Sequence, residues 1–188
     1  NYLLGQDGNI GGKTGTTDDA GYCFTSAYNR DGDEIYTVVL NSTTTDQRFT
    51  DTATLANWYY GHKVTVAIAN TQEKTANGNP LMARIGQTDW TDKTIDATLA
   101  DPTAQATVFS LAGEVTEKVS YDDLSGTVHV GDKVGSVTLK QDGTKIAVMD
   151  LVADEEGAGP NPIEWLLVKL DRLGRRIDNR PLTAESET

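Results

Sequence analysis

Two Asp-Gly dipeptides, each set between runs of β-type residues, constrain this chain more than any other feature. They are Asp31-Gly32, between residues 21–28 and 34–41, and Asp142-Gly143, between residues 136–140 and 145–151. Asp-Gly is favoured in the two-residue turn of a β-hairpin because both central positions need a positive φ. The sequence therefore predicts two antiparallel hairpins.

Short β-type runs separated by turn residues continue through the middle of the chain. They cover residues 64–69, 81–85, 94–99, 106–112, 115–120, 126–130, 136–140 and 145–151. Runs at this spacing are typical of a sandwich. We expect an all-β sandwich over residues 62–158, with Trp90 in its core and the pairs Asp122-Asp123 and Glu155-Glu156 in solvated loops.

A separate segment precedes this β region. Its 42–46 stretch supplies N-cap chemistry for a helix in which Phe49, Ala53, Ala56 and Tyr60 recur at helical spacing. The sequence therefore predicts a strand, a hairpin and a helix in residues 1–61. For the whole chain it predicts an α+β protein.

Composition excludes several classes of function. The 188 residues carry 16 Lys and Arg against 28 Asp and Glu, a net charge of -12, which disfavours nucleic acid as a partner. No apolar run approaches the roughly 20 residues of a membrane span. Because Cys23 is the single cysteine, an internal disulfide is excluded. The only histidines are His62 and His129, so there is no Cys/His cluster and we expect no metal or other cofactor.

The triplet Lys13-Thr14-Gly15 is the candidate binding element. Lysine supplies a positive charge, threonine a hydroxyl donor, and glycine removes the Cβ so that a substrate backbone can lie against the strand. In penicillin-binding enzymes and β-lactamases such a triplet accompanies a Ser-x-x-Lys nucleophile. As a bare tripeptide it is better explained as a surface turn.

A longer pattern surrounds the triplet. It comprises Asn1-x-Leu3-Leu4, Lys13-Thr14-Gly15-x-Thr17-Asp18-x-Ala20-Gly21-Tyr22, Val38-Val39-Leu40, Arg48 and Trp58. This pattern, over about the first third of the chain, resembles the last part of the catalytic domain of low-molecular-mass penicillin-binding proteins, the serine-type D-alanyl-D-alanine carboxypeptidases. The resemblance implies a partial penicillin-binding (β-lactamase-like) catalytic segment followed by the β domain that many of these enzymes carry.

The resemblance also implies an activity: removal of the terminal D-alanine from peptidoglycan stem peptides through a serine acyl-enzyme, which β-lactams inhibit. Neither a Ser-x-x-Lys nor a Ser-x-Asn occurs in the 188 residues. Because the chain also starts at Asn1, we expect it to be a C-terminal fragment, inactive alone, of an extracytoplasmic cell-envelope enzyme. Its substrate would be a stem peptide ending in D-Ala-D-Ala.

The same resemblance assigns roles to five residues. Lys13 supports the charge balance of the site, Thr14 contacts the terminal carboxylate of the substrate, and Gly15 lets the substrate strand approach. The Thr16 N–H is one of two oxyanion donors, although family members commonly have a larger residue there. Arg48 would favour a free carboxylate; it can equally be a surface cation in the first helical turn, where the dipole disfavours it.

A last segment, residues 159–188, comprises a linker, a helix and a polar tail. The helix, residues 163–177, has an apolar stripe of Ile163, Leu166, Leu167, Leu170, Leu173 and Ile177, with Lys169, Arg172, Arg175 and Arg176 on the other face. It resembles the amphipathic helix that anchors such carboxypeptidases at the outer face of the cytoplasmic membrane. Alternatively, the stripe packs on the β domain or on another subunit. We expect residues 181–188 to be disordered.

The chain can also be interpreted in two different ways. It can be a non-catalytic β-sandwich spacer or assembly module with a vestigial hairpin, or a β-lactamase fragment, which shares Lys-Thr-Gly but does not predict the further strands. In the leading interpretation Tyr22, Phe24, Val38 and Leu40 lose packing partners. We then expect the part before about Gly61 to fray or to be rescued by forming a homodimer.

Overall fold

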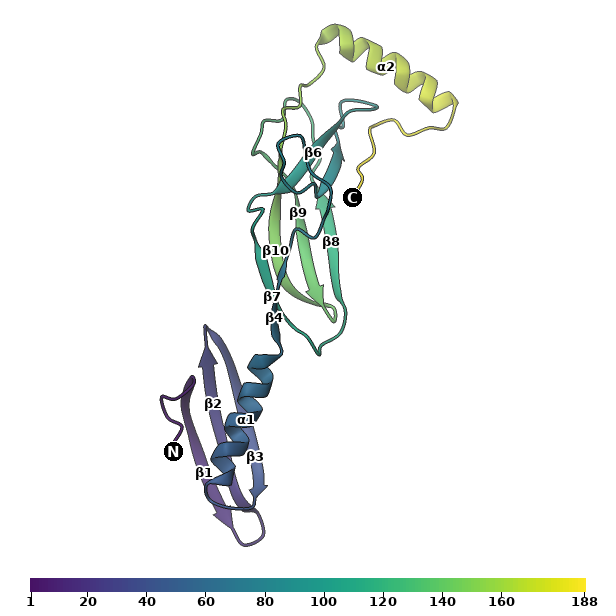
Figure 1. Ribbon diagram of the computed structural model, residues 1–188. Coiled ribbons are helices and arrows are strands. Elements are labelled where there is room, and N and C mark those ends of the chain that lie inside the picture. The colour runs from purple at the N-terminus through teal and green to yellow at the C-terminus, as the bar shows by residue number, and fades with distance from the viewer. The chain divides into compact units, whose positions relative to one another are not determined.

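The computed structural model describes residues 1–188 and divides into two compact units, Asn1–Val64 and Thr65–Thr188 (Figure 1). The first unit contains β1 (Asn9–Thr17), β2 (Gly21–Arg30), β3 (Asp33–Ser42) and α1 (Gln47–Gly61), and β4 (Lys63–Ala67) starts at its end. The second contains β5 (Ala83–Gly86), β6 (Thr94–Leu99), β7 (Gln105–Phe109), β8 (Val115–Tyr121), β9 (Lys133–Gln141), β10 (Thr144–Ala153) and α2 (Pro162–Ile177). The predicted α+β class is confirmed.

The first unit is a three-stranded antiparallel sheet in the order β1-β2-β3. The β2–β3 turn has φ of 53° at Asp31 and 86° at Gly32, as a hairpin turn with two positive φ values requires. The hairpin predicted from this dipeptide is therefore present.

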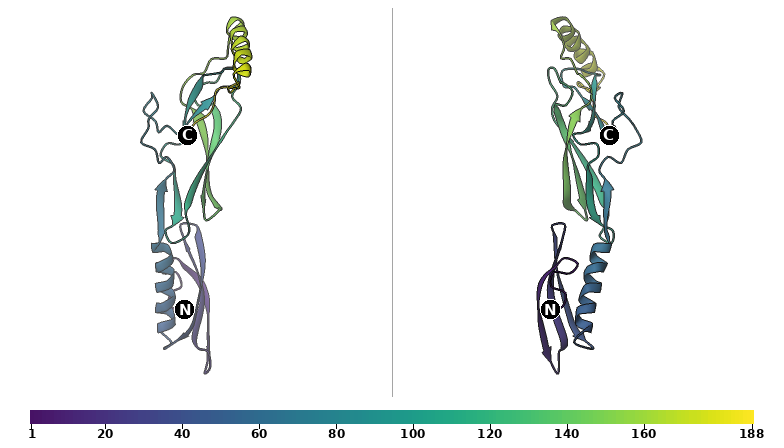
Figure 2. Two further views of the ribbon diagram at one scale, coloured as in Figure 1. Left: turned by 90° about the vertical axis from the view of Figure 1, so that its right-hand side faces the viewer. Right: turned by 60° about the vertical axis from the view of Figure 1, so that its left-hand side comes forward.

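Helix α1 covers one face of this sheet (Figure 2). The Phe49 ring meets the Phe24 ring edge-on at 5.0 Å between centroids, and Phe24 and Tyr28 are each 1% exposed. The 42–46 stretch supplies the helix start as predicted: the Thr44 hydroxyl accepts the Gln47 N–H at 3.0 Å, whereas Asp46 makes no side-chain cap. Aromatic packing from the helix thus seals this face.

The opposite face of the sheet is open and apolar. Tyr36, Val38 and Leu40 point away from α1 and are 73%, 57% and 69% exposed. The expectation that Phe24 would lack partners was wrong, because strand alternation turns Phe24 towards the helix and Val38 and Leu40 of β3 away from it.

In the second unit, an antiparallel sheet in the order β5-β6-β10-β9-β8 and the β4–β7 pair enclose one apolar core. Ile85, Leu99, Val134 and Leu151 are among its most buried members. Trp90 is also buried, and its indole N–H donates to the Ala158 carbonyl at 2.9 Å.

One local prediction for this unit was wrong. Residues 126–130 form no strand but a single bridge between Val128 and Gly157, because Gly126 and Gly131 both have positive φ and turn the chain. Glu155 and Glu156 are exposed in a loop, as predicted, and the Glu155 carboxylate also accepts the Asp96 N–H at 3.0 Å.

The C-terminal tail is ordered, which corrects the prediction of disorder over residues 181–188. Arg84 and Glu187 exchange two backbone hydrogen bonds of 2.8 Å, and the Gly86 N–H donates to the Ser186 hydroxyl at 3.0 Å. The tail is polar, but the outer edge of β5 has unpaired backbone groups. Pairing satisfies the backbone groups of the tail and of β5 together.

Gly86→Ala is expected to detach this tail. A Cβ at Gly86 would collide with the Ala184 carbonyl oxygen, so we expect a loss of about 1–3 kcal/mol from the free energy of unfolding of this unit. Urea unfolding and faster hydrogen exchange at the Arg84 amide would report it. In the control, Gly174→Ala on α2, a Cβ meets nothing within 4 Å, and no loss is expected. Unchanged exchange at Arg84 in Gly86→Ala would contradict the tail pairing.

Candidate active-site wall on the first sheet

The Lys-Thr-Gly triplet lies in the middle of β1, which pairs only with β2 and so has an open outer edge. In the register, Thr14 stands opposite Phe24, which faces α1. Thr14 and Thr16 therefore lie on the helix-covered face of the strand, and Lys13 and Gly15 on the open face. A ligand lying along the outer edge of β1 can reach both pairs.

Lys13 has no carboxylate partner in the structure. Its ammonium group donates to the Thr14 carbonyl at 2.6 Å, and the residue is exposed. A lysine held by no ion pair keeps its charge available for an anionic ligand.

Two glycines of β1 differ in how much space the surrounding structure leaves for a side chain. At Gly12, a Cβ would lie 2.5 Å from the Thr25 carbonyl oxygen and 2.7 Å from the Phe24 ring, so packing excludes a side chain. At Gly15, a Cβ would meet nothing within 4 Å. Internal packing therefore does not require a glycine at position 15.

Arg48 reaches the strand from the first turn of α1. Its guanidinium donates to the Thr16 hydroxyl at 3.3 Å and lies 5.0 Å from the centre of the Phe49 ring. The Thr16 hydroxyl in turn donates to the Gly15 carbonyl at 2.8 Å. The structure thus brings Arg48 and Thr16 together and holds Arg48 half-buried beside the triplet rather than free in solvent.

Sequence reasoning missed Cys23 as a neighbour of this wall. Counting back across the β1–β2 turn places it opposite Gly15, on the open face beside Lys13. Its thiol lies 3.2 Å from the Ala20 carbonyl. The hairpin register was the signal that could have identified it.

No serine of the first unit is arranged for acyl transfer. Its unit contains two serines, and both are engaged: Ser26 is buried against the Thr37 hydroxyl at 2.9 Å, and Ser42 contacts Asp51 at 2.7 Å. Neither pairs with a lysine or histidine that could activate it. The hydrogen bonds from Gln47 and Ser42 lower the pKa of Asp51, which fits a structural carboxylate at the helix start.

No protein-family model and no curated protein matches this sequence. Among solved structures, the chain is similar to a D-alanyl-D-alanine carboxypeptidase, DacD, from Francisella tularensis, with 23% identity over 85% of this chain and a TM-score of 0.38. It is also similar to PBP3 from Streptococcus pneumoniae, described as a peptidoglycan synthesis regulatory factor (22%, 83% and 0.43), and to penicillin binding protein 5 from Haemophilus influenzae (19%, 77% and 0.40).

The chain spans 38%, 46% and 41% of the lengths of these three proteins, respectively. They are the kind of protein that the β1 pattern resembles.

Removing the Phe24 side chain should destabilise the first unit strongly, and removing the Lys13 side chain should hardly affect its stability. Phe24→Ala removes the ring that packs on Phe49 and should cost the first unit about 3–5 kcal/mol, whereas Lys13→Ala, at an exposed site without an ion pair, should change stability by less than about 0.5 kcal/mol. Hydrogen exchange of the β2 amides measures both. A large loss in Lys13→Ala would mean that Lys13 supports the fold and is not free for a ligand.

Proposed function

We propose that this chain supplies the Lys-Thr-Gly wall and the β domain of a serine-type D-alanyl-D-alanine carboxypeptidase. One observation carries the proposal: an open edge strand presents an unpaired Lys13 and a Gly15 that packing does not require. An edge strand of this kind suits an extended peptide, which pairs through its backbone and needs a cation near its carboxylate.

The proposed substrate is a stem peptide ending in D-Ala-D-Ala, lying along β1. The Thr14 hydroxyl would bind its terminal carboxylate, Lys13 and Arg48 would supply positive charge, and the Thr16 N–H would stabilise the oxyanion. A serine outside these 188 residues would attack the penultimate carbonyl carbon, forming an ester as the amide bond breaks and D-alanine leaves. Water then hydrolyses the ester. β-Lactams would acylate the same serine.

The test is a labelled penicillin. The chain of residues 1–188 should form no covalent adduct, because none of its serines is followed by lysine at the third position. The gene product expressed from its complete coding region should be labelled, and Lys13→Ala or Thr14→Val should slow its acylation about 10²-fold or more.

If the 1–188 chain is labelled and the label is lost on mutating one of its own serines, the proposal that the nucleophilic serine lies outside this chain is wrong. No labelling of the complete gene product would instead favour the second candidate, a non-catalytic spacer or assembly module. The open face of Tyr36, Val38 and Leu40 supports that candidate, since it also offers a contact for homodimerisation.

We also propose that α2 attaches the protein to a membrane surface, at the outer face of the cytoplasmic membrane. The helix starts at a capping box, in which the Asn161 side chain accepts the Glu164 N–H and the Glu164 carboxylate accepts the Asn161 N–H. Its stripe residues (Ile163, Leu166, Leu167, Leu170, Leu173 and Ile177) are 56–80% exposed. An exposed apolar stripe on an amphipathic helix suits a contact along the surface. Neither helix of the chain is long and apolar enough to cross a bilayer.

The polar side of α2 docks on its own unit. Val168 is buried there, and the Arg172 guanidinium donates to the Thr88 carbonyl at 2.6 Å and the Leu182 carbonyl at 2.9 Å. A hydrogen bond from Thr91 and the Arg175 guanidinium lower the pKa of Asp171. The stripe does not pack on the β domain, so that alternative is wrong, and the basic face is not wholly free.

Liposome sedimentation tests the proposed anchor. The chain should bind vesicles containing anionic lipid, and Leu167→Glu should abolish binding because it places a charge in the middle of the stripe. Arg176→Gln, the control, removes one exposed cation worth about 1 kcal/mol and should weaken binding only modestly. Equal binding by the wild-type and Leu167→Glu chains would exclude this surface as the anchor.

A further inference from the structure

The two edge strands of the five-stranded sheet differ in whether another segment of the chain pairs with their outer side. The C-terminal tail covers β5 through the Arg84–Glu187 bridge, whereas β8 pairs only with β9 and has no partner on its other side. The β8 strand contains no proline and no bulge, the usual devices that blunt an edge. It is an intact, unpaired strand edge.

The register identifies which backbone groups face outward. The Asp142 N–H donates to the Glu114 carbonyl and the Asp122 N–H to the Val134 carbonyl. Because hydrogen-bonded and non-bonded positions alternate in an antiparallel ladder, the even-numbered residues of β8 bond to β9. The N–H and C=O groups of its odd-numbered residues, Val115, Glu117, Val119 and Tyr121, therefore point out from the sheet.

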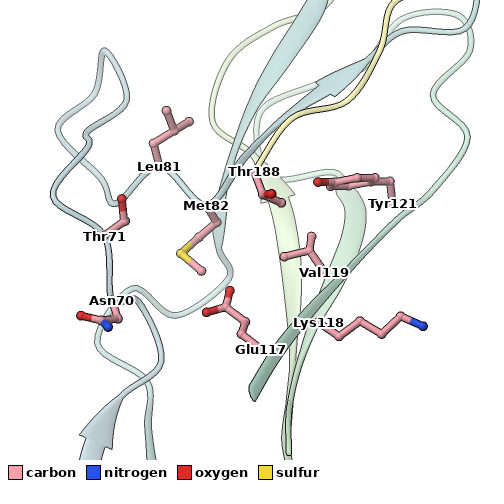
Figure 3. A pocket seen from close by; sticks show the side chains of 9 residues that line it. All are labelled: Asn70, Thr71, Leu81, Met82, Glu117, Lys118, Val119, Tyr121 and Thr188. Atoms are coloured by element: carbon pink, nitrogen blue, oxygen red, sulfur yellow. The ribbon is translucent and has the colours of Figure 1, made fainter. Parts of the chain in front are cut away.

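A groove of about 540 Å³ runs beside this edge (Figure 3). Glu117, Val119 and Tyr121 form one wall, and Asn70 and Met82 belong to the other. The side chains of Glu117, Val119 and Tyr121 stand on one face of the sheet, and Lys118, on the other face, also lines the space, so the groove reaches the strand edge where the outward backbone groups lie. Another strand can pair with the whole row of these groups.

Glu117 and Lys118 are the charged side chains that line this groove. The Glu117 carboxylate points from β8 towards Met82, whereas the Lys118 side chain points away (Figure 3). No ion pair or hydrogen bond engages the Glu117 carboxylate, and burial of this group raises its pKa. An unbalanced, partly desolvated carboxylate is stabilised most by a cation brought close to it.

We propose that the β8 edge and its groove bind an extended peptide segment that pairs with Val115–Tyr121 and places a lysine or arginine side chain against Glu117. The backbone ladder would supply affinity, and the Glu117 carboxylate would select basic over acidic segments. This site belongs to the second unit and is independent of the function proposed for β1.

A simpler role for Glu117 makes a different prediction. An inward-pointing charge on an edge strand also prevents the edges of two copies from pairing. If this is its sole role, Glu117→Gln makes the chain self-associate, and peptides of either charge bind alike or not at all.

The experiment titrates the isotope-labelled full chain with two acetylated, amidated peptides, TVKVT and TVEVT, and follows backbone amides by NMR. We expect shifts centred on the amides of Glu117, Val119 and Tyr121, with TVKVT binding at least about tenfold more tightly than TVEVT. Glu117→Gln should remove this preference and leave the shifts in place. Lys118→Gln, the matched control whose side chain points away from Glu117 (Figure 3), should keep it.

Val119→Pro tests the ladder itself. It removes an outward N–H, so the β8–β9 pairing has no bond to lose, and binding of both peptides should disappear. If this variant does not fold, Glu117→Gln alone decides the outcome. Equal affinity for the two peptides, shifts that avoid β8, or β8 shifts caused only by raising the protein concentration would overturn the proposal, the last by showing that a second copy occupies the edge.

Discussion

Backbone hydrogen bonds between neighbouring strands hold both units of this chain together. The edge strands, whose outer backbone groups are unpaired, provide the proposed binding sites. A strand inside a sheet has its N–H and C=O groups satisfied on both sides, whereas an edge strand leaves every second residue unsatisfied. The C-terminal tail closes the β5 edge, but the β1 and β8 edges stay open. The Lys-Thr-Gly triplet lies on the β1 edge and Glu117 on the β8 edge, so both proposed binding sites follow from the same physical constraint.

One-sided packing is the second constraint, and it is clearest in the first unit. Phe24 and Phe49 seal the face beneath α1, and the hydrophobic free energy of that contact supports a sheet of three strands, which is marginal by itself. The other face keeps Val38 and Leu40 exposed. Such a surface suits a covering element or a second copy, and it explains why one fold is compatible both with a wall of a larger active site and with an assembly module.

The terminal helix reverses the usual arrangement of an amphipathic helix on a globular domain. Its polar side docks on the β domain through Val168 and the hydrogen bonds of Arg172, and its apolar stripe faces outward. Part-buried guanidinium-to-carbonyl bonds hold the helix, together with Val168 alone of its apolar residues. The stripe is therefore left exposed, which is the physical basis of the proposed anchor.

Local rules were enough to predict much of the fold. The sequence by itself determined the two Asp-Gly hairpins, because positive φ at both turn positions selects these residues, and the start of α2, because Asn161, Pro162 and Glu164 form a cap within one turn. It also determined that Lys13 and Gly15 share one face of a strand and Thr14 and Thr16 the other. The pattern around β1 suggested the family, and its proposed site residues lie on one strand and the adjoining helix turn.

Only the tertiary structure decided how distant segments meet. The pairing of Glu187 with Arg84, the approach of Arg48 to Thr16 and the groove beside Glu117 all join residues far apart in the chain. No local propensity encodes such contacts, since a polar tail is predicted to be disordered until a strand edge is there to pair with it, and a glutamate on a strand gives no sign of a groove until another segment lies beside it. Their stability comes from backbone groups and buried area that exist only once both partners are in place.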